Sequence, residues 1–315
     1  MDDGVAVMLR TLDGAFPAVE QMSVVDARAA VAMRRAAFAN LDDVATDDRF
    51  IVTVAGPVAV RIYRPRGGGD QPRAGAVFYH GGGFVLCDID SHDGFCQTMS
   101  RHTGSVVVSV GYRLAPEHPA PAAAEDAHGA FAWVVDHADE LGVDPRRIAV
   151  AGDSAGGNLA AVTAIMCRER GTSMPAAQVL LYPVIDPTFD TPSYLRRAAG
   201  YFTTRAALQW YWRQYLGGTA VPEPAYLVAP GRAASLAGLP PAVVVTATLD
   251  PLHSVGVAYA RHLRSAGVAV LHRDFRGLFH GFLTMMAFPP AVTARELLWS
   301  DMRELLAARV PEAVS

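Results

Sequence analysis

The stretch Ala151-Gly-Asp-Ser-Ala-Gly-Gly-Asn158, AGDSAGGN, places one serine among three glycines. It follows the apolar run 147–151, expected to be a strand, and opens the alanine-rich segment 154–170, expected to be a helix that stops at Gly171. G-x-S-x-G between a strand and a helix indicates a sharp reversal that strains the serine backbone and needs neighbours without Cβ atoms. The motif therefore predicts that the hydroxyl of Ser154 is exposed at the carboxyl end of a β-sheet.

The rest of the chain alternates apolar, β-branched runs with stretches of helical character. Two strands are expected within 50–63, separated at Gly56-Pro57, and a helix over 121–141 is expected to end before Gly142. Six further runs are expected to be buried strands, at 74–79, 105–110, 147–151, 178–182, 242–248 and 268–274. This alternation predicts an α/β fold whose central sheet of about eight strands is mostly parallel and flanked by helices.

Two segments, 1–45 and 187–218, do not fit this alternation. The first contains Ser23-Val-Val-Asp26, which is similar to a capping box, ahead of a helical run over 27–38. The second contains the aromatic cluster Trp210-Tyr-Trp212. From spacing alone, the two segments are equally well explained as a small helical lid or as ordinary peripheral helices. If they form a lid, the α/β domain comprises 46–186 and 219–315.

With 315 residues, 51% of them hydrophobic, the chain can bury a sizeable core. Its net charge of −4 is scattered, so neither a nucleic-acid partner nor stable membrane association is expected. The chain has no lysine, which excludes Schiff-base chemistry and a Walker-type phosphate loop.

Its three cysteines lack zinc or redox spacing, so no metal or cofactor is expected. An acidic amino terminus and the lack of an apolar run of about 18 residues predict a soluble, cytoplasmic protein. A homodimer is neither predicted nor excluded.

A second glycine run, His80-Gly-Gly-Gly83, follows a predicted strand upstream of the serine. Alone it is a weak signal, because a triple glycine also suits a flexible turn. Beside the serine motif it becomes specific, because a nucleophilic serine needs at least two N–H donors about 3 Å from the developing oxyanion. His80 is expected to orient this loop, and Asp153 to brace loops near the site.

The serine also needs a base, and in this arrangement the order along the chain is serine, acid, histidine. Among the histidines after Ser154, His280 lies in a glycine-flanked loop that follows the last predicted strand. Asp250 ends the strand before it and is the preferred acid on order and spacing. The competing groups are the acids Asp186 and Asp274 and the base His253, whereas His262 and His272 are expected to be structural.

At these positions the sequence resembles the bacterial hormone-sensitive-lipase-like carboxylesterases of the α/β-hydrolase fold, in their GDSAGG branch. The matching stretches are His80-Gly-Gly-Gly83, Ser91-His-Asp93, Tyr112-Arg-Leu-Ala-Pro-Glu-His-Pro119, Gly152-Asp-Ser-Ala-Gly-Gly157, Leu181-Tyr-Pro183, Asp250-Pro-Leu252 and His280-Gly-Phe282. Two positions depart from the family: Ser254 stands where an aspartate is common, and Phe84 where tryptophan is frequent.

The resemblance implies a catalytic triad of Ser154, Asp250 and His280 and a helical cap over an acyl pocket. The implied oxyanion donors are the amides of Gly82, Gly83 and Ala155. Six aromatic residues are candidates to line the pocket, with the core as the alternative: Phe84, Phe202, Trp210, Tyr211, Trp212 and Phe282.

The expected activity is hydrolysis of small-molecule carboxylic esters through an acyl-enzyme, on short to medium acyl chains by resemblance. One alternative is a non-catalytic small-molecule binder, because the fold includes receptors that resemble the family but lack the histidine. Another is an amidase, a peptidase or a lactonase, which would use the same residues.

Overall fold

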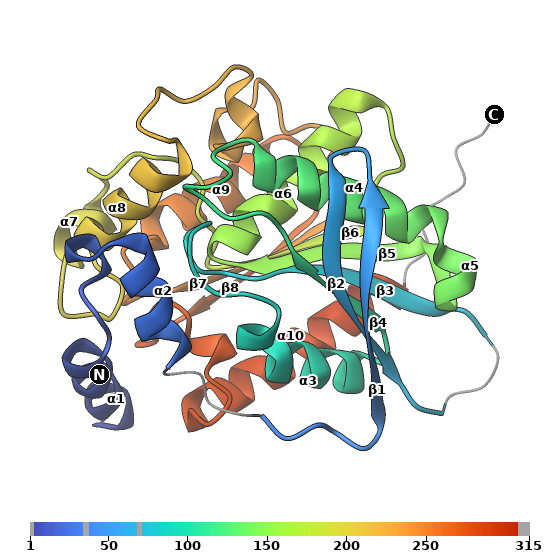
Figure 1. The fold of residues 1–315 in the computed structure, drawn as a ribbon, viewed down its shortest axis with the longest axis horizontal. Helices are drawn as coiled ribbons and strands as arrows, with labels where there is room; N and C mark the ends of the chain where they lie inside the picture. The colour runs from blue at the N-terminus through green and yellow to red at the C-terminus, as the bar shows by residue number, and fades with distance from the viewer. Residues whose placement is uncertain (1–2, 34–37, 68–70, 308–315) are drawn as a thin grey trace.

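The computed structural model describes residues 3–33, 38–67 and 71–307. Its centre is an eight-stranded sheet in the order β1-β2-β4-β3-β5-β6-β7-β8 (Figure 1). The strands are β1 (Val44–Thr53), β2 (Gly56–Pro65), β3 (Arg73–Tyr79), β4 (Val106–Gly111), β5 (Val143–Asp153), β6 (Ala177–Leu181), β7 (Ala242–Ala247) and β8 (Val270–Phe275). The predicted sheet of about eight strands is therefore confirmed.

Strands β3 to β8 are parallel where they pair, and the antiparallel pairs are β1 with β2 and β2 with β4. The prediction that the run 268–274 is buried was wrong, because β8 is the edge strand beside β7. Its residues are half-buried or exposed, and the Leu271 side chain is exposed. An edge strand lacks a second neighbour that would cover it.

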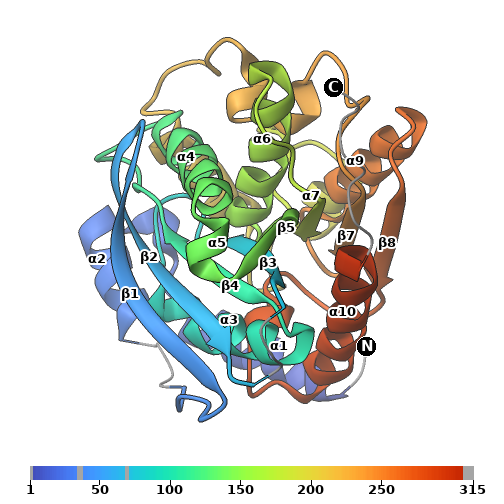
Figure 2. The ribbon, with the colours of Figure 1, turned by 90° about the vertical axis from the view of Figure 1, so that its right-hand side faces the viewer.

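Helices cover both faces of the sheet (Figure 2). They are α1 (Asp3–Ala15), α2 (Val24–Ala32), α3 (Asp93–Thr103), α4 (Ala122–Asp136), α5 (Ala138–Leu141), α6 (Ala155–Arg170), α7 (Pro192–Arg196), α8 (Arg205–Tyr215), α9 (His253–Ser265) and α10 (Pro289–Ala307). Helices α4, α6 and α9 lie on one face, which we call the α6 side, and α3 and α10 lie on the other, the α10 side.

Successive residues of the inner strands enter opposite cores. Val150 and Val244 pack on the α6 side, whereas Ala151 and Val243 pack on the α10 side. Side chains alternate across a strand, so a parallel strand covered on both faces is apolar at every position. This accounts for the unbroken apolar runs of the sequence.

The helix predicted over 121–141 is divided into α4 and α5 at His137. The ring of His137 stacks on Trp133, and both its Nδ1 and its backbone N–H bond to the carbonyl of Trp133, at 2.9 and 3.0 Å. His137 has φ −110° and ψ 21°, outside helical values. The side chain therefore ends α4 through a local contact that apolar periodicity does not reveal.

The two segments outside the alternation place helices at the carboxyl edge of the sheet, α1 and α2 from the first and α7 and α8 from the second (Figure 1). Ser23 caps α2, as its motif indicates, by accepting a hydrogen bond from the Asp26 N–H at 3.1 Å. The helix predicted over 27–38 ends at Ala32, and positions 34–37 lie outside the described residues. The division into cap and catalytic domain stays a prediction.

Candidate active site

Ser154 stands at the turn between β5 and α6, with φ 56° and ψ −114°. A positive φ is costly for any residue with a Cβ, so surrounding contacts must impose it. Two residues later, a Cβ on Gly156 would lie 1.8 Å from the carbonyl oxygen of Tyr79 on β3. The glycine therefore lets α6 start against the neighbouring strand, and this close approach turns the serine outward.

A chain of hydrogen bonds joins the serine to a histidine and an acid. The Nε2 atom of His280 lies 2.9 Å from Ser154 Oγ, and its Nδ1 lies 2.7 Å from Asp250 Oδ2. Asp250 follows β7, His280 follows β8, and the other carboxylate oxygen of Asp250 accepts the Leu252 N–H at 2.7 Å. The structure thus brings together, from three strand ends, the three residues named from the sequence.

The site is buried, which changes the acid–base behaviour of the histidine. Burial opposes protonation of His280, but the adjacent Asp250 carboxylate outweighs it, so the pKa of His280 is raised above its ordinary value. The buried charge of Asp153 acts in the same direction. The raised pKa makes His280 a stronger base than a free imidazole.

The competing residues have other partners. Asp186 binds Arg232, and Asp274 accepts a hydrogen bond from Thr246. His253 begins α9, and its Nε2 lies 3.0 Å from Asp274 Oδ1, away from the serine. The Nε2 of His272 bonds to the same Thr246 hydroxyl, at 2.8 Å.

The glycine loop after β3 lies beside the serine, and Gly82 and Gly83 line the same cavity. Gly83 has φ 64°, and a Cβ there would lie 2.3 Å from the ring of Tyr211 on α8. The loop therefore packs its bare backbone against an aromatic ring. Ala155 is the first residue of α6, where amide groups have no intrahelical acceptor.

Asp153 links this loop to the serine. Its Oδ1 accepts the Gly81 N–H at 2.8 Å and lies 3.1 Å from His92 Nε2, and all three groups are buried. Burial favours the neutral acid, but His92 and other nearby imidazoles outweigh it, so the pKa of Asp153 is lowered. Asp153 is a residue that the sequence predicts to brace loops. The sequence predicts no role for His92, whose only signal is the Ser91-His-Asp93 match.

His80 supports the loop from its other side. Its Nδ1 lies 2.7 Å from the Gly81 carbonyl, its ring stacks on Tyr112, and the Tyr112 hydroxyl donates to the His80 carbonyl at 2.6 Å. Burial and the nearby His92 lower the pKa of His80 to about 4. An uncharged His80 with Nδ1 donating therefore holds the loop in place.

A cavity of about 290 Å³ opens at Ser154 and His280. Its walls include four of the six aromatic residues considered from the sequence: Phe84, Phe202, Tyr211 and Trp212. The other two lie outside this lining: Trp210 packs in the core of the α6 side, and the Phe282 ring packs against Tyr182 on the α10 side. Leu208 of α8, to which the sequence analysis gave no role, also lines the cavity.

Within residues 3–33, 38–67 and 71–307, no three His, Cys, Asp or Glu side chains are placed to share a metal ion. The same residues include no helix that is both long enough and apolar enough to cross a membrane.

Comparison with known proteins agrees with this geometry. Residues 76–284 match a family described as having the alpha/beta hydrolase fold. The carboxylic ester hydrolase LipN of Mycobacterium tuberculosis is 46% identical over 73% of this chain and 62% of its own length. The esterase LipI of the same organism is 43% identical over 81% of this chain and 79% of its own. The chain belongs to the hormone-sensitive-lipase-like carboxylesterases of the α/β-hydrolase fold.

A solved structure extends the likeness over the whole fold of this carboxylesterase. The hyperthermophilic esterase of the archaeon Pyrobaculum calidifontis superposes with a TM-score of 0.88 at 37% identity, covering 98% of this chain and 99% of that one. The family and fold predicted from the motifs are thus confirmed, as is the enzyme class of carboxylic ester hydrolase. The chain spans less than two thirds of LipN, so LipN's activity as a whole protein bears on this chain only as a proposal.

Proposed function

We propose that this carboxylesterase hydrolyses small-molecule esters of short to medium acyl chains with Ser154, His280 and Asp250 as its catalytic residues. Ser154 Oγ attacks the ester carbonyl, a bond forms between Oγ and the carbonyl carbon, and His280 Nε2 takes the hydroxyl proton. The oxyanion accepts hydrogen bonds from the amides of Gly82, Gly83 and Ala155. His280 then gives the proton to the leaving alcohol oxygen as the carbon–oxygen bond breaks.

Water completes the cycle. His280 removes a proton from a water molecule as it attacks the acyl-enzyme, and returns that proton to Ser154 Oγ as the carboxylic acid leaves. Asp250 keeps Nδ1 as the protonated nitrogen, so that Nε2 faces the serine in both half-reactions, and it stabilises the imidazolium. The protons balance without a cofactor.

The carrying observation is the continuous hydrogen-bonded series from Asp250 through His280 to Ser154, at 2.7 and 2.9 Å. A pocket that only bound a ligand would have no need for a strained serine facing a histidine whose pKa is raised. We also propose that 1–45 and 187–218 form a cap, since Phe16, Phe202 and Tyr211 from these segments line the cavity over the serine.

The test compares Ser154→Ala with Ser300→Ala, a control on α10 whose hydroxyl lies 3.5 Å from Glu304 Oε1 and which is not part of the cavity lining. Ser154→Ala is expected to keep its circular dichroism spectrum and unfolding temperature, lose hydrolysis of aryl esters by at least about 10³-fold, and take up no organophosphate. Ser300→Ala should match the wild type. Undiminished turnover by Ser154→Ala, with its fold intact, would refute the assignment, and faster cleavage of an anilide than of the matching ester would make the chain an amidase.

A further inference from the structure

Two serines from distant parts of the chain join the starts of two helices. Ser193 is the second residue of α7, and Ser254 is the second residue of α9, the helix that follows the acid loop. The Ser193 N–H donates to Ser254 Oγ at 3.2 Å, and the Ser254 N–H donates to Ser193 Oγ at 2.9 Å. The N-cap residues, Thr191 and Leu252, make no side-chain capping bond. Each member of this serine pair therefore caps the helix of the other.

The serine pair also reaches the catalytic acid. Ser193 has a single hydroxyl proton, which it donates to the carbonyl oxygen of Pro251 at 2.6 Å. That carbonyl belongs to the same peptide group as the Leu252 N–H, which donates to Asp250 Oδ1 at 2.7 Å. A peptide group is planar, so a hydrogen bond that fixes its oxygen also orients its N–H. The Ser193 hydroxyl therefore holds the group that holds one oxygen of the carboxylate.

The hydrogen bonds from α7 to the nucleophile form one unbroken series. Asp250 uses its second oxygen, Oδ2, for His280 Nδ1 at 2.7 Å, and His280 Nε2 lies 2.9 Å from Ser154 Oγ. A carboxylate held at Oδ1 can present Oδ2 to the imidazole in one direction only. The orientation of the acid toward His280 thus depends on a residue outside the triad.

The start of this series is shielded from water. Ser193 is 4% exposed, and Asp250 and Leu252 are buried as well. In a buried site a lost hydrogen bond leaves its donor or acceptor without a substitute partner from solvent. Loss of the Ser193 hydroxyl should therefore be felt at the peptide beside Asp250.

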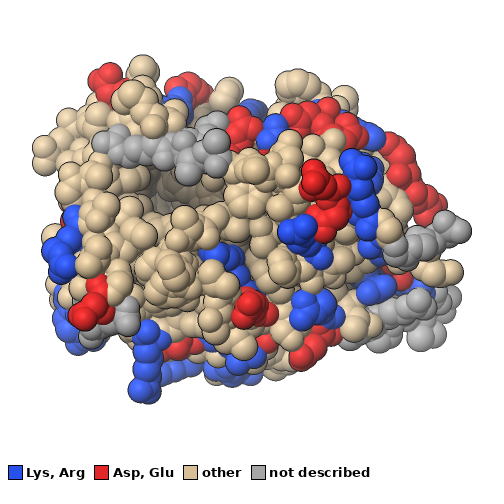
Figure 3. Space-filling model, turned by 90° about the horizontal axis from the view of Figure 1, so that it is seen from below, with Lys and Arg blue, Asp and Glu red and all other residues tan. Residues whose placement is uncertain are grey.

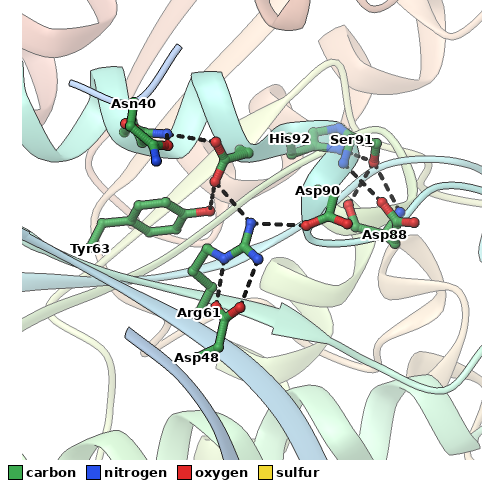
Figure 4. A network of polar contacts seen from close by, with 10 residues as sticks. Asn40, Asp48, Arg61, Tyr63, Asp88, Asp90, Ser91 and His92 are labelled. Atoms are coloured by element: carbon green, nitrogen blue, oxygen red, sulfur yellow. Dashed lines mark hydrogen bonds and ion pairs between the residues drawn. The ribbon is translucent and has the colours of Figure 1, made fainter. Parts of the chain in front are cut away.

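Charged contacts on the surface are of a different kind. Figure 3 shows basic and acidic side chains next to one another on the face seen from below, and Figure 4 shows Arg61 bound to Asp48 and Asp90. Both of these carboxylates are largely exposed, and salt screens exposed pairs. The serine pair carries no charge, so the effect of breaking it should be the same at low and high salt.

Position 254 is where the family often has an aspartate, and the contacts of Ser254 indicate what this position supplies. The Ser193 N–H needs an acceptor, and either a hydroxyl or a carboxylate oxygen can provide it. Ser254 does so without adding a charge at the start of α9. Ser254 therefore holds Ser193, and Ser193 holds the peptide beside the acid.

We propose that Ser193 is a positioning residue for the catalytic acid, because its hydroxyl sets the peptide between Pro251 and Leu252 and, through it, the carboxylate of Asp250. The proposal rests on the triad proposed above and adds to it a residue of α7, which lies outside the strand ends that carry the triad. Ser193 is not part of the cavity lining, so it acts on the rate without touching the substrate.

Ser193→Ala removes the hydroxyl and should lower kcat by about three- to tenfold, the equivalent of one net hydrogen bond. KM should change less than about twofold, because Ser193 does not line the cavity. Burial lowers the pKa of His280, whereas Asp250 and Asp153 raise it above its ordinary value. A less firmly held Asp250 raises it less, so the acid limb of kcat/KM should move to lower pH by about 0.4 to 1 unit.

Two further variants separate positioning from support of the fold. Ser254→Ala removes the acceptor of the Ser193 N–H but leaves both bonds of the Ser193 hydroxyl, so it should lower the unfolding temperature and keep the acid limb in place. Thr103→Ala is the matched control at the end of α3. The Thr103 hydroxyl donates to the Met99 carbonyl at 2.7 Å and accepts the Ser105 N–H at 3.3 Å, and it should leave kcat unchanged when removed.

A double-mutant cycle shows whether Ser193 acts through the acid. In an Asp250→Ala background there is no carboxylate to position, so adding Ser193→Ala should lower kcat/KM by less than about twofold. A residue that only supported the fold would change stability without moving the acid limb. Ser193→Cys, with a weakly donating thiol of similar size, takes the place of Ser193→Ala if that variant does not fold.

The outcomes distinguish this proposal from the triad itself. If the Ser193 variant kept the wild-type kcat and acid limb while Asp250→Ala was strongly impaired, the triad would stand and the positioning role would be refuted. Equal losses of kcat in Ser193→Ala and Thr103→Ala would refute it too. A wild-type kcat in Asp250→Ala would instead contradict the proposed triad.

Discussion

Asp153 allows a test of how the nucleophile and the oxyanion loop are coupled. Its Oδ1 atom accepts from both the Gly81 N–H and His92 Nε2, at 2.8 and 3.1 Å, so one oxygen holds two groups. Its Oδ2 atom would lie 2.5 Å from a Cβ on Gly81 and therefore packs against that glycine. Asp153→Ala removes both functions, whereas Asp153→Asn keeps an oxygen at the Oδ1 position and a group of similar size at Oδ2.

The expected magnitudes follow from these contacts. In Asp153→Ala, two buried donors lose their acceptor at about 1–3 kcal/mol each, so folding should weaken by roughly 2–6 kcal/mol. Displacement of one oxyanion donor lowers kcat by about 10² to 10³. In Asp153→Asn both hydrogen bonds remain without their charge assistance, a loss of about 1 kcal/mol for each. The asparagine variant should therefore recover most of the activity that the alanine variant loses.

A pH profile separates this positioning role from a general loss of stability. The negative charge of Asp153 raises the pKa of His280, and the base works only when neutral. Removal of that charge in Asp153→Asn lowers the pKa of His280, so the acid limb of kcat/KM should move to lower pH. A residue that only supported the fold would leave the limb in place.

The assay is kcat/KM for an aryl acetate from about pH 4.5 to 9, with unfolding temperatures measured on the same samples. Ser91→Ala is a control beside the network, because Ser91 contacts His92 but not Asp153. If Asp153→Ala retained the wild-type kcat, or if the acid limb of Asp153→Asn coincided with that of the wild type, Asp153 would not couple the loop to the base.

Three further predictions use other contacts of the site. Asp250→Asn should lower kcat by about 10³ to 10⁴. It should also move the acid limb of kcat/KM to lower pH by more than Asp153→Asn does, because Asp250 contributes most to raising the pKa of His280. Profiles of rate against pH, recorded at high enzyme concentration, check both results. Gly83→Ala should lower the free energy of unfolding by roughly 2–5 kcal/mol, because residue 83 has φ 64° and its new Cβ would overlap the Tyr211 ring. Adding Tyr211→Ala should remove the overlap but leave the backbone strain. A double-mutant cycle by denaturant unfolding measures the coupling between the two substitutions, and a coupling of zero would contradict the contact. Arg295→Met removes the buried donor to three carbonyls of the loop after the histidine and should destabilise the fold by about 3 kcal/mol, seen as a lower unfolding temperature; an unchanged temperature would show that the loop does not depend on this clamp.

The chemistry-bearing residues could be predicted because their signals are local. A strand followed by G-x-S-x-G marks the turn at Ser154, since Gly156 has no room for a Cβ, and chain order limits the base to a late loop such as that of His280. The strands were found for a similar reason, since burial on both faces produces unbroken apolar runs. The burial of the edge strand β8 was mispredicted because the apolar run Val268-Ala-Val-Leu271 leads into it, although the polar residues His272, Arg273 and Asp274 follow.

What the sequence did not reveal depends on contacts between distant segments. His92 lies 61 positions before Asp153 (153 − 92), and Tyr211 packs on Gly83 from 128 positions away (211 − 83), so neither pairing has a signature along the chain. Trp210 and Tyr211 are adjacent aromatic residues of α8, yet only Tyr211 lines the cavity. The rotation of the helix from one residue to the next determines which of the two side chains faces the serine, and the composition of the segment does not reveal it.

The reacting groups and the walls around them are held by different kinds of contact. The serine and the glycine loop are fixed where backbone meets backbone or a buried carboxylate: Gly156 against Tyr79, and Gly81 against Asp153. Such contacts have no flexible side chain that can yield, so any change there should reduce the rate for every ester. The cavity wall also includes long, unbranched side chains such as Met285, which take no part in the triad's hydrogen bonds. Substitutions at such positions should therefore alter which ester is accepted while the triad geometry stays as it is, so rate and selectivity can be changed separately in this fold.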